Sequence, residues 1–300
     1  LQLFLEYTSF ILKEVLDALT PAKLSEAGER DAWILDTTLG DGGHTIGLLR
    51  EGRKVYGMDQ DPQALKRAQK RLIGLGFDES CFVLEKRNFA DLSGLKSFKG
   101  ILFDLGVSSL QLLDPTRGFS FSRPGPLDMR MDPELKVNAK DLVNGLNKGE
   151  LYELFSKLGQ EKLARPISEA LVLSRQINTI TTTKQLSDIV EKVYWKIGIR
   201  LKKIHPATRV FQALRIAVND ELNGLREALP QAFYHLEPGG RIVVLSFHSL
   251  EDKIVKDMFN QWQSENLGKV LTKKPTVATE SEISENLYAR SAKMRVFEKI

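Results

Sequence analysis

Cysteine is nearly absent from this sequence, since Cys81 is the only one among 300 residues. A lone cysteine cannot form an intramolecular disulfide or a multi-cysteine zinc cage, and it fits a reducing compartment. Histidine is scarce too, and the four histidines, at positions 44, 205, 235 and 248, do not pair at the spacing of metal ligands on a helix. We therefore expect a cytoplasmic protein without a metal site. His235 comes shortly before a Pro-Gly-Gly turn, and we expect it at the solvated surface.

Long apolar runs are also missing. Four charged residues interrupt the opening stretch of residues 1–19: Glu6, Lys13, Glu14 and Asp17. That stretch predicts an amphipathic helix rather than a signal peptide or a membrane span. The chain is 42% hydrophobic and 27% charged, which is ordinary for a globular protein and long enough for one large domain with an insertion.

Acidic residues are absent from one long stretch, residues 192–219. Its seven basic residues are Lys192, Lys196, Arg200, Lys202, Lys203, Arg209 and Arg215. A run of charge is more often a solvated helix face than a binding surface. The net charge of +4 and the length of this acid-free stretch nevertheless favour a polyanionic partner.

Buried strands and helices alternate in the first third of the chain. Three strand-like runs end at an acid, Trp33–Asp36, Lys54–Asp59 and Gly100–Asp104, and a further run covers Cys81–Leu84. Helical patterns lie between them, one of them after Pro62, a residue favoured in the first turn of a helix. The alternation predicts an α/β fold with a doubly wound, mostly parallel sheet.

The pattern then changes. Residues 114–133 form a loop rich in Gly, Pro, Ser and Arg, and helical periodicity follows over residues 139–191. We expect a smaller inserted helical domain at residues 115–207, with residues 1–114 and 208–300 forming the sheet domain. In the second part we expect one helix over residues 209–236, strands at 238–245 and 292–298, and a mobile loop at 273–284.

The strand-end acids predict a ligand site. In an open parallel sheet, ligands bind at the carboxyl ends of the strands, where Asp36, Asp59 and Asp104 all fall. The glycines at positions 40, 42 and 43 allow the backbone to approach a ligand, and an acid that closes the second strand can accept hydrogen bonds from ribose hydroxyls. Together these features predict an adenosine-bearing cofactor.

A nicotinamide dinucleotide is disfavoured. The dinucleotide motif ends in a small residue, whereas the sixth position of the loop counted from Gly40 is Thr45. A pyrophosphate favours a helix N-terminus without acids, and this loop carries Asp41 and follows Asp36. Acids around the loop suit a cationic sulfonium ligand, which indicates S-adenosylmethionine.

Several longer motifs resemble the bacterial 16S ribosomal RNA cytosine-N4 methyltransferase family, also called MraW or RsmH. They fall at residues 36–44, 57–62, 100–109, 118–121, 125–131, 205–209, 211–216 and 246–252, in that order along nearly the whole chain. The resemblance implies a Rossmann-like fold and transfer of a methyl group from S-adenosylmethionine to a cytosine N4 in the decoding region. It places cofactor contacts at Gly42, Gly43, His44, Asp59, Phe89, Asp104 and Gln111.

The sequence departs from the family pattern outside its cofactor motifs. The departures are Tyr7, Ser9, Leu110, Gln160 and Leu287. They fall near the N-terminus, in the predicted insertion and near the C-terminus.

Catalysis needs an acceptor for a proton of the target amine, and Asp104 is our first candidate. His248 follows a later strand directly and is the second, as a contact to the base edge or as a proton acceptor. Phe247 beside it could stack on an extruded cytosine. Alternatively, residues 246–252 only cap the helix that follows.

RNA contact is predicted at two further places. The segment of residues 117–131 interleaves aromatics with arginines, as single-stranded RNA sites do, although a purely structural loop is equally compatible with it. The predicted RNA-binding residues are Arg123, Arg200, Lys202, Lys203, Arg209 and Phe247. The expected partner is 16S ribosomal RNA or the small subunit, with no membrane, and the oligomeric state stays open.

Two other functions compete with this one. A methyltransferase of the same fold could act on a protein or a small molecule, but the basic stretch and the extent of the resemblance argue against it. A non-catalytic ribosome-assembly factor could keep the fold without turnover. Loss of the loop glycines or of the acids at the strand ends would indicate such a non-catalytic factor. This sequence keeps both.

Overall fold

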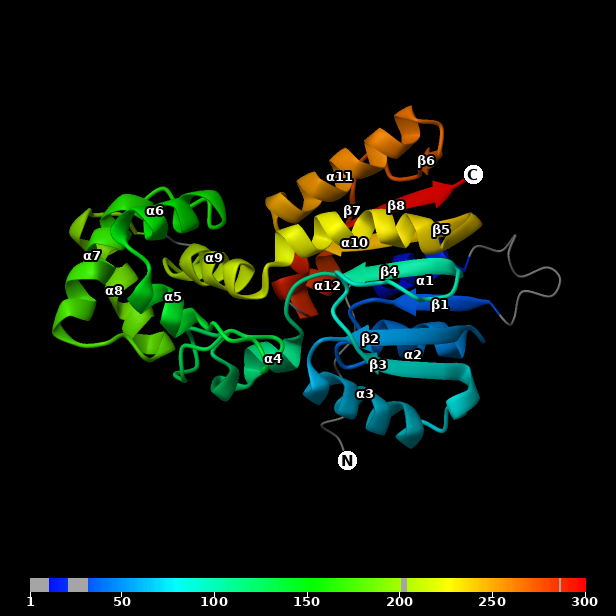
Figure 1. The fold of residues 1–300 in the computed structure, drawn as a ribbon, viewed down its shortest axis with the longest axis horizontal. Coiled ribbons are helices and arrows are strands. Elements are labelled where there is room, and N and C mark those ends of the chain that lie inside the picture. Colours follow the sequence, from blue (N-terminus) through cyan, green and yellow to red (C-terminus); the bar gives the residue numbers. More distant parts are fainter. Residues whose placement is uncertain (1–10, 21–31, 201–203, 286) are drawn as a thin grey trace. The chain divides into compact units, whose positions relative to one another are not determined.

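The computed structural model describes residues 11–20, 32–200, 204–285 and 287–300 (Figure 1). The chain divides into two compact units, one of residues 1–106 and 222–300 and the other of residues 107–221. The second unit begins earlier and ends later than the expected 115–207. The reason is packing, because Val107 and Leu112 before this range, and Val210, Leu214 and Val218 after it, share one core with the helices of the insertion.

The first unit is built on one sheet of strands in the order β3-β2-β1-β4-β5-β8-β6, with β7 beside β8. The strands are β1 (Trp33–Asp36), β2 (Lys54–Asp59), β3 (Phe82–Lys86), β4 (Phe98–Asp104), β5 (Leu236–Ser246), β6 (Gly268–Val270), β7 (Thr276–Val277) and β8 (Lys293–Lys299). The first five are parallel, and β8 runs antiparallel to β5. The predicted doubly wound, mostly parallel α/β sheet is confirmed.

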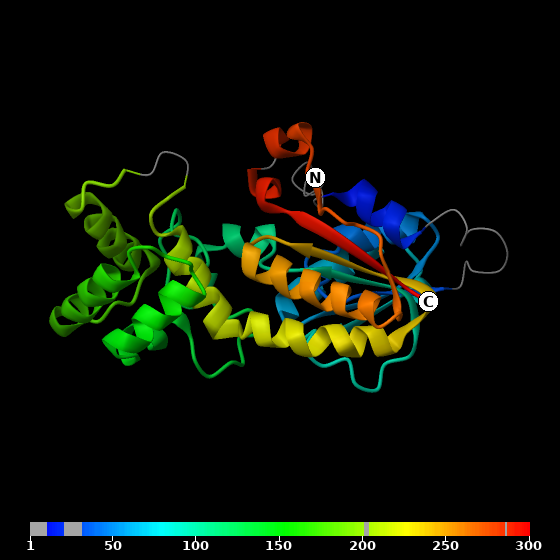
Figure 2. The ribbon, with the colours of Figure 1, turned by 90° about the horizontal axis from the view of Figure 1, so that it is seen from above.

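Helices cover both faces of this sheet (Figure 2). They are α1 (Leu12–Leu19), α2 (Gly43–Arg50), α3 (Pro62–Gly74), α10 (Glu221–His235), α11 (Ser249–Ser264) and α12 (Glu280–Glu285), with short 3-10 turns at Glu79–Cys81 and Leu287–Ser291. Side chains of α1 and α2 form one core with alternate strand residues such as Ile34. Those of α10 and α11 form another with the opposite alternation, including Leu35. The central strands β1, β4 and β5 therefore bury residues on both faces, as their continuous apolar sequences require.

The second unit is helical, with one apolar core of its own. Its elements are α4 (Ser109–Leu113), a 3-10 turn (Pro115–Arg117), α5 (Ala139–Gly145), α6 (Lys148–Lys157), α7 (Ala164–Ile177), α8 (Thr183–Lys196) and α9 (Thr208–Asn219). Side-chain caps begin several of them, for example Asn138 for α5, Asn147 for α6 and Thr182 for α8.

Three expectations were wrong. The single helix over residues 209–236 is two helices, because Asp220 adopts a left-handed conformation with φ of 48° and ends α9. The loop at 273–284 contains β7 and most of α12, which its polar composition concealed. His235, expected at the solvated surface, is buried at 8% exposure. Of the predicted first helix, residues 12–19 are helical, Ile11 precedes them as the N-cap, and residues 1–10 lie outside the described residues. Within the described part of the chain, no helix has the length and apolarity needed to cross a membrane.

Candidate cofactor and active site

The strand order reverses direction at β1. This strand pairs with β2 on one side and with β4 on the other, all parallel, so Asp36, Asp59 and Asp104 end three neighbouring strands at one edge. Open α/β sheets bind their ligands at this kind of switch point. The first unit thus places the predicted cofactor residues where its topology favours a ligand.

Asp36 supports the loop from beneath. It is 1% exposed, accepts a hydrogen bond from Thr45 Oγ1 at 2.7 Å and another from the Thr38 backbone N–H at 3.3 Å. Burial raises the pKa of this carboxyl, while the hydrogen bond from Thr45 works against the shift. Thr45, which breaks the dinucleotide pattern, therefore has a positive role, since its hydroxyl ties the first turn of α2 to β1.

The loop between β1 and α2 is anchored on Asp59. The Gly40 backbone N–H donates to Asp59 Oδ2 at 2.8 Å, and the Asp61 N–H donates to Oδ1 at 2.8 Å. Gly42 has φ of 76°, a conformation that side chains rarely adopt, and it precedes α2. Desolvation raises the pKa of Asp59 to about 6. Its carboxylate is half-buried, so each oxygen keeps lone pairs for a ligand.

Asp41, by contrast, does not present a bare charge. Arg67 Nε of α3 lies 2.7 Å from its Oδ1, and Arg71 donates to its backbone carbonyl at 3.2 Å. The electrostatic part of the cofactor prediction is therefore wrong for Asp41, because a paired acid contributes little field at the loop. The pairing instead holds the loop against α3.

Asp104 sits between the loop and β4. Its backbone N–H donates to Thr38 Oγ1 at 2.6 Å, and its carboxylate oxygen Oδ2 lies 3.4 Å from Nδ1 of His44, the second residue of α2. His44 is 4% exposed, whereas the Asp104 side chain keeps 25% of its surface accessible. The buried His44 imidazole therefore holds the partly accessible Asp104 carboxylate in place.

Phe89 follows β3 and is half-buried. Its ring packs edge-on against Phe103 with centroids 6.2 Å apart, and it lies beside Gly224 of α10, where an added Cβ would come within 3.4 Å of it. These contacts give Phe89 a core role without using its whole surface. Gln111, the remaining predicted cofactor contact, belongs to the second unit, where its side chain accepts from the Ser108 N–H at 2.9 Å and closes the cap of α4.

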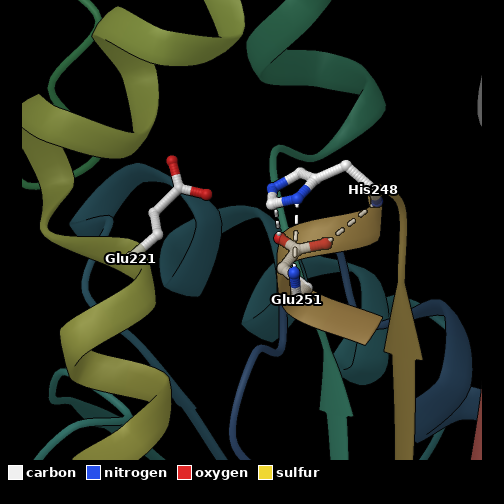
Figure 3. Close-up of side chains that lie close together, drawn as sticks. All are labelled: Glu221, His248 and Glu251. Atoms are coloured by element: carbon white, nitrogen blue, oxygen red, sulfur yellow. Dashed lines mark hydrogen bonds and ion pairs between the residues drawn. The ribbon is translucent and has the colours of Figure 1, made fainter. Parts of the chain in front are cut away.

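His248 is held by Glu251, one turn further along (Figure 3). The Glu251 backbone N–H donates to His248 Nδ1 at 3.4 Å, and Nε2 lies 3.1 Å from Glu251 Oε1, though outside hydrogen-bond alignment. The Phe247 N–H donates to Glu251 Oε2 at 2.8 Å. Because Nδ1 accepts, the ring proton belongs on Nε2. The helix-capping alternative for residues 246–252 is therefore present in the structure.

In the second unit, two arginines of the aromatic segment are committed to the protein itself. Arg117 donates to the carbonyls of Arg130 and Met131, and Arg130 binds Asp128 through two bonds of 2.8 Å. Arg123 is exposed and makes one bond, to the Leu113 carbonyl at 2.9 Å. Of the three, Arg123 is the one whose guanidinium is most available to a ligand.

Two arginines of the acid-free stretch, residues 192–219, bind groups that lie outside the stretch. Arg215 makes two hydrogen bonds of 2.8 Å to Glu221, and Arg209 donates to the Gln160 carbonyl at 3.0 Å. Arg200 is exposed. Lys202 and Lys203 lie outside the described residues. Phe247, of the first unit, is half-buried against an apolar core.

Sequence reasoning missed the residues that hold the site in place. These are Thr38, Thr45, Arg67 and Glu251, each of which acts on a predicted residue through a hydrogen bond or ion pair. For Thr38, the signal available in the sequence was the Thr37-Thr38 pair beside the glycines.

Comparison with known proteins agrees with this geometry. The profile of the MraW methylase family matches residues 5–300. The ribosomal RNA small subunit methyltransferase H of Coprothermobacter proteolyticus is 42% identical over 97% of both chains, and that of Carboxydothermus hydrogenoformans is 43% identical over 89% of this chain and 91% of its own. Among solved structures, an rRNA methylase from Streptococcus thermophilus matches at 13% identity over 92% of both chains with a TM-score of 0.43, too weak a likeness to argue from. The chain belongs to the MraW methylase family, whose members are methyltransferases.

Proposed function

We propose that this protein transfers a methyl group from S-adenosylmethionine to the exocyclic N4 amine of a cytosine in the decoding region of 16S ribosomal RNA. The observation that carries the proposal is the family match over residues 5–300, combined with intact acids at the switch point of the sheet. Relatives named ribosomal RNA small subunit methyltransferase H, at 41–46% identity, support the substrate class.

The residues present fit the cofactor. Gly42 gives the loop a left-handed conformation that other residues rarely adopt, and Asp59 keeps acceptor capacity on both carboxylate oxygens for ribose hydroxyls. Gly43 and His44 open α2 next to them, Phe89 offers an apolar ring for adenine, and Gln111 is proposed to complete the set. When bound, S-adenosylmethionine supplies an electrophilic methyl group on a sulfonium sulfur.

The chain's own task is to align the amine and to take up a proton. Cytosine N4 is a weak nucleophile because its lone pair is delocalised into the ring, so its position and the removal of a proton from it matter. We assign the acceptor role to the Asp104 carboxylate. It ends β4 at the switch point, is partly accessible, and is oriented by His44 and Thr38.

His248 takes a different role. Since its Nδ1 accepts the Glu251 N–H, the imidazole carries its proton on Nε2, a buried atom 3.1 Å from Glu251 Oε1, and this nitrogen donates and does not accept. We therefore propose His248 as a hydrogen-bond donor that positions the base, with Phe247 beside it as a stacking surface. Proton removal then falls to Asp104.

RNA binding is proposed for the exposed basic residues. Arg123, Arg200 and Arg209, together with Lys202 and Lys203, are the candidates for phosphate contacts in the helical unit. The cytoplasm, where small subunits are assembled, is the proposed location.

The test uses small ribosomal subunits from cells that lack this methylation. We expect the protein to transfer the tritiated methyl group of S-adenosylmethionine to these subunits, and nuclease digestion to recover the label as N4-methylcytidine. Label on ribosomal protein, or on another nucleoside, would overturn the substrate assignment. Absence of transfer to either naked RNA or subunits, with the cofactor bound, would favour the non-catalytic assembly factor.

A further inference from the structure

The first unit contains a basic hollow outside the candidate active site. Helix α11, strand β6 and the residues after it enclose a cavity of about 270 Å³. Three cationic side chains line it, from Lys256, Lys273 and Arg295, and the amides of Asn260 and Gln263 add polar groups. No acidic side chain is among its lining residues. Every charged side chain that lines the hollow is therefore a cation.

The three cations that line this hollow differ in whether a neighbouring carboxylate neutralises them. Arg295 is 6% exposed and donates to Asp252 at 2.6 and 3.3 Å. Burial works to raise the pKa of Asp252, but the hydrogen bonds and charge of Arg295 outweigh it and lower the pKa. Lys256 and Lys273 are exposed, and among the described residues neither has a carboxylate within ion-pair distance. Two cations are therefore available to an anion.

The surrounding sequence extends the charge. Residues 253–274 hold five lysines and two acids, the latter being Asp257 and Glu265. Lys253 precedes Lys256 by one helical turn, so the two share a face of α11. Lys269 lies on β6, and Lys274 follows Lys273; all three additional lysines are exposed. Exposed lysines on α11, on β6 and in the segment after it attract a polyanion more than a single small anion.

We propose that this hollow, lined by Lys256 and Lys273, binds the phosphate backbone of the substrate RNA. The inference rests on the proposed function for the identity of the RNA. The cavity is smaller than the roughly 300–1,000 Å³ of pockets that enclose whole small-molecule ligands, and it suits one phosphate with part of its sugar. The amides of Asn260 and Gln263 supply neutral hydrogen bonds, which nucleic-acid sites use for phosphate and sugar oxygens. The contact fixes the position of the RNA and carries no sequence preference.

The experiment measures binding of 16S RNA and methylation of subunits at several salt concentrations for the full chain. In K256Q/K273Q we expect weaker RNA binding and a KM for subunits that is raised roughly threefold to tenfold, with kcat and cofactor affinity unchanged. The slope of log affinity against log salt should become shallower by about 0.7–0.9 for each lost phosphate contact.

Two control variants separate this contact from general charge. K66Q/K70Q removes two exposed lysines of α3 and should leave the slope unchanged. K256R/K273R keeps both charges and should retain the slope of the unmodified protein. An unchanged slope in K256Q/K273Q, or an equal change in K66Q/K70Q, overturns the proposal. An acidic protein partner would show as binding of subunits that depends on Lys256 and Lys273 while binding of naked RNA does not. If the unmodified protein methylates nothing, the proposed function fails, and the binding measurement still decides on the hollow.

Discussion

His44 Nδ1 lies 3.4 Å from the Asp104 carboxylate and so joins the first turn of α2 to the end of β4. The contact joins two residues that lie 60 positions apart in the sequence, through a buried imidazole. It gives the partly accessible Asp104 carboxylate a fixed orientation at the switch point, where we propose that the target amine binds.

Cofactor affinity should depend on pH through Asp59. Its pKa is raised to about 6, so protonation of the carboxyl grows as pH falls below that value, and only the ionised form accepts both ribose hydroxyls. We expect the Kd for S-adenosylhomocysteine to stay constant above pH 7 and to rise up to about tenfold per pH unit below 6. Calorimetry of the unmodified protein measures this.

Asp59→Asn is the matched control for that titration, because it removes the ionisable group and keeps the shape. Its affinity should be weaker by about 1–3 kcal/mol and flat with pH. A titration that persists in Asp59→Asn would assign the pH dependence to another group.

The Thr45 hydroxyl should matter for stability. It donates to the buried Asp36 carboxylate, so Thr45→Val leaves that group short of a partner and should lower the free energy of unfolding by about 1–3 kcal/mol. Thr45→Ser keeps the hydroxyl and should lose less. Chemical denaturation of the three proteins decides, and equal stability of the Val variant would mean that water replaces the hydroxyl.

Much of this architecture was predictable, and the reasons for success and failure are local. Apolar runs that end at Asp36, Asp59 and Asp104 identified three strands and the edge where the site lies, because a buried parallel strand needs a continuous apolar sequence. The break at Asp220 was not predictable, because a single residue in a left-handed conformation leaves no trace in helical periodicity. The ion pair of Arg67 with Asp41 was not predictable either, since the two residues lie 26 positions apart in the sequence.

Basic residues of the helical unit should differ in their effect on RNA binding. Lys202→Gln with Lys203→Gln should make the salt dependence shallower by roughly one unit per lost phosphate contact. Arg215→Gln removes the same kind of charge, but Arg215 is engaged with Glu221, so it should cost stability and leave the slope unchanged. An unchanged slope in the Lys202 and Lys203 variant would return these lysines to a solvated face.

We expect His248 to position the cytosine base rather than to take up its proton. His248→Asn keeps a capping acceptor and an N–H donor, so we expect a modest rise in KM for RNA with a nearly normal kcat. His248→Ala removes both and should also destabilise the protein by on the order of 1 kcal/mol, as a lost helix cap does. A pH–rate profile whose fall in rate at low pH disappears in His248→Asn would contradict the donor role and restore His248 as the proton acceptor.

We propose that the Asp104 carboxylate meets the cytosine N4 amine and accepts its proton. The most direct measurement is the single-turnover rate of methyl transfer to undermethylated small subunits by Asp104→Asn, with cofactor and subunits both saturating and S-adenosylhomocysteine affinity measured alongside. We expect a rate at least about a hundredfold lower, with N4-methylcytidine still the product, because the amide cannot accept the proton. A near-normal rate in Asp104→Asn would contradict it, and would show that Asp104 only holds the cofactor while water or backbone takes the proton.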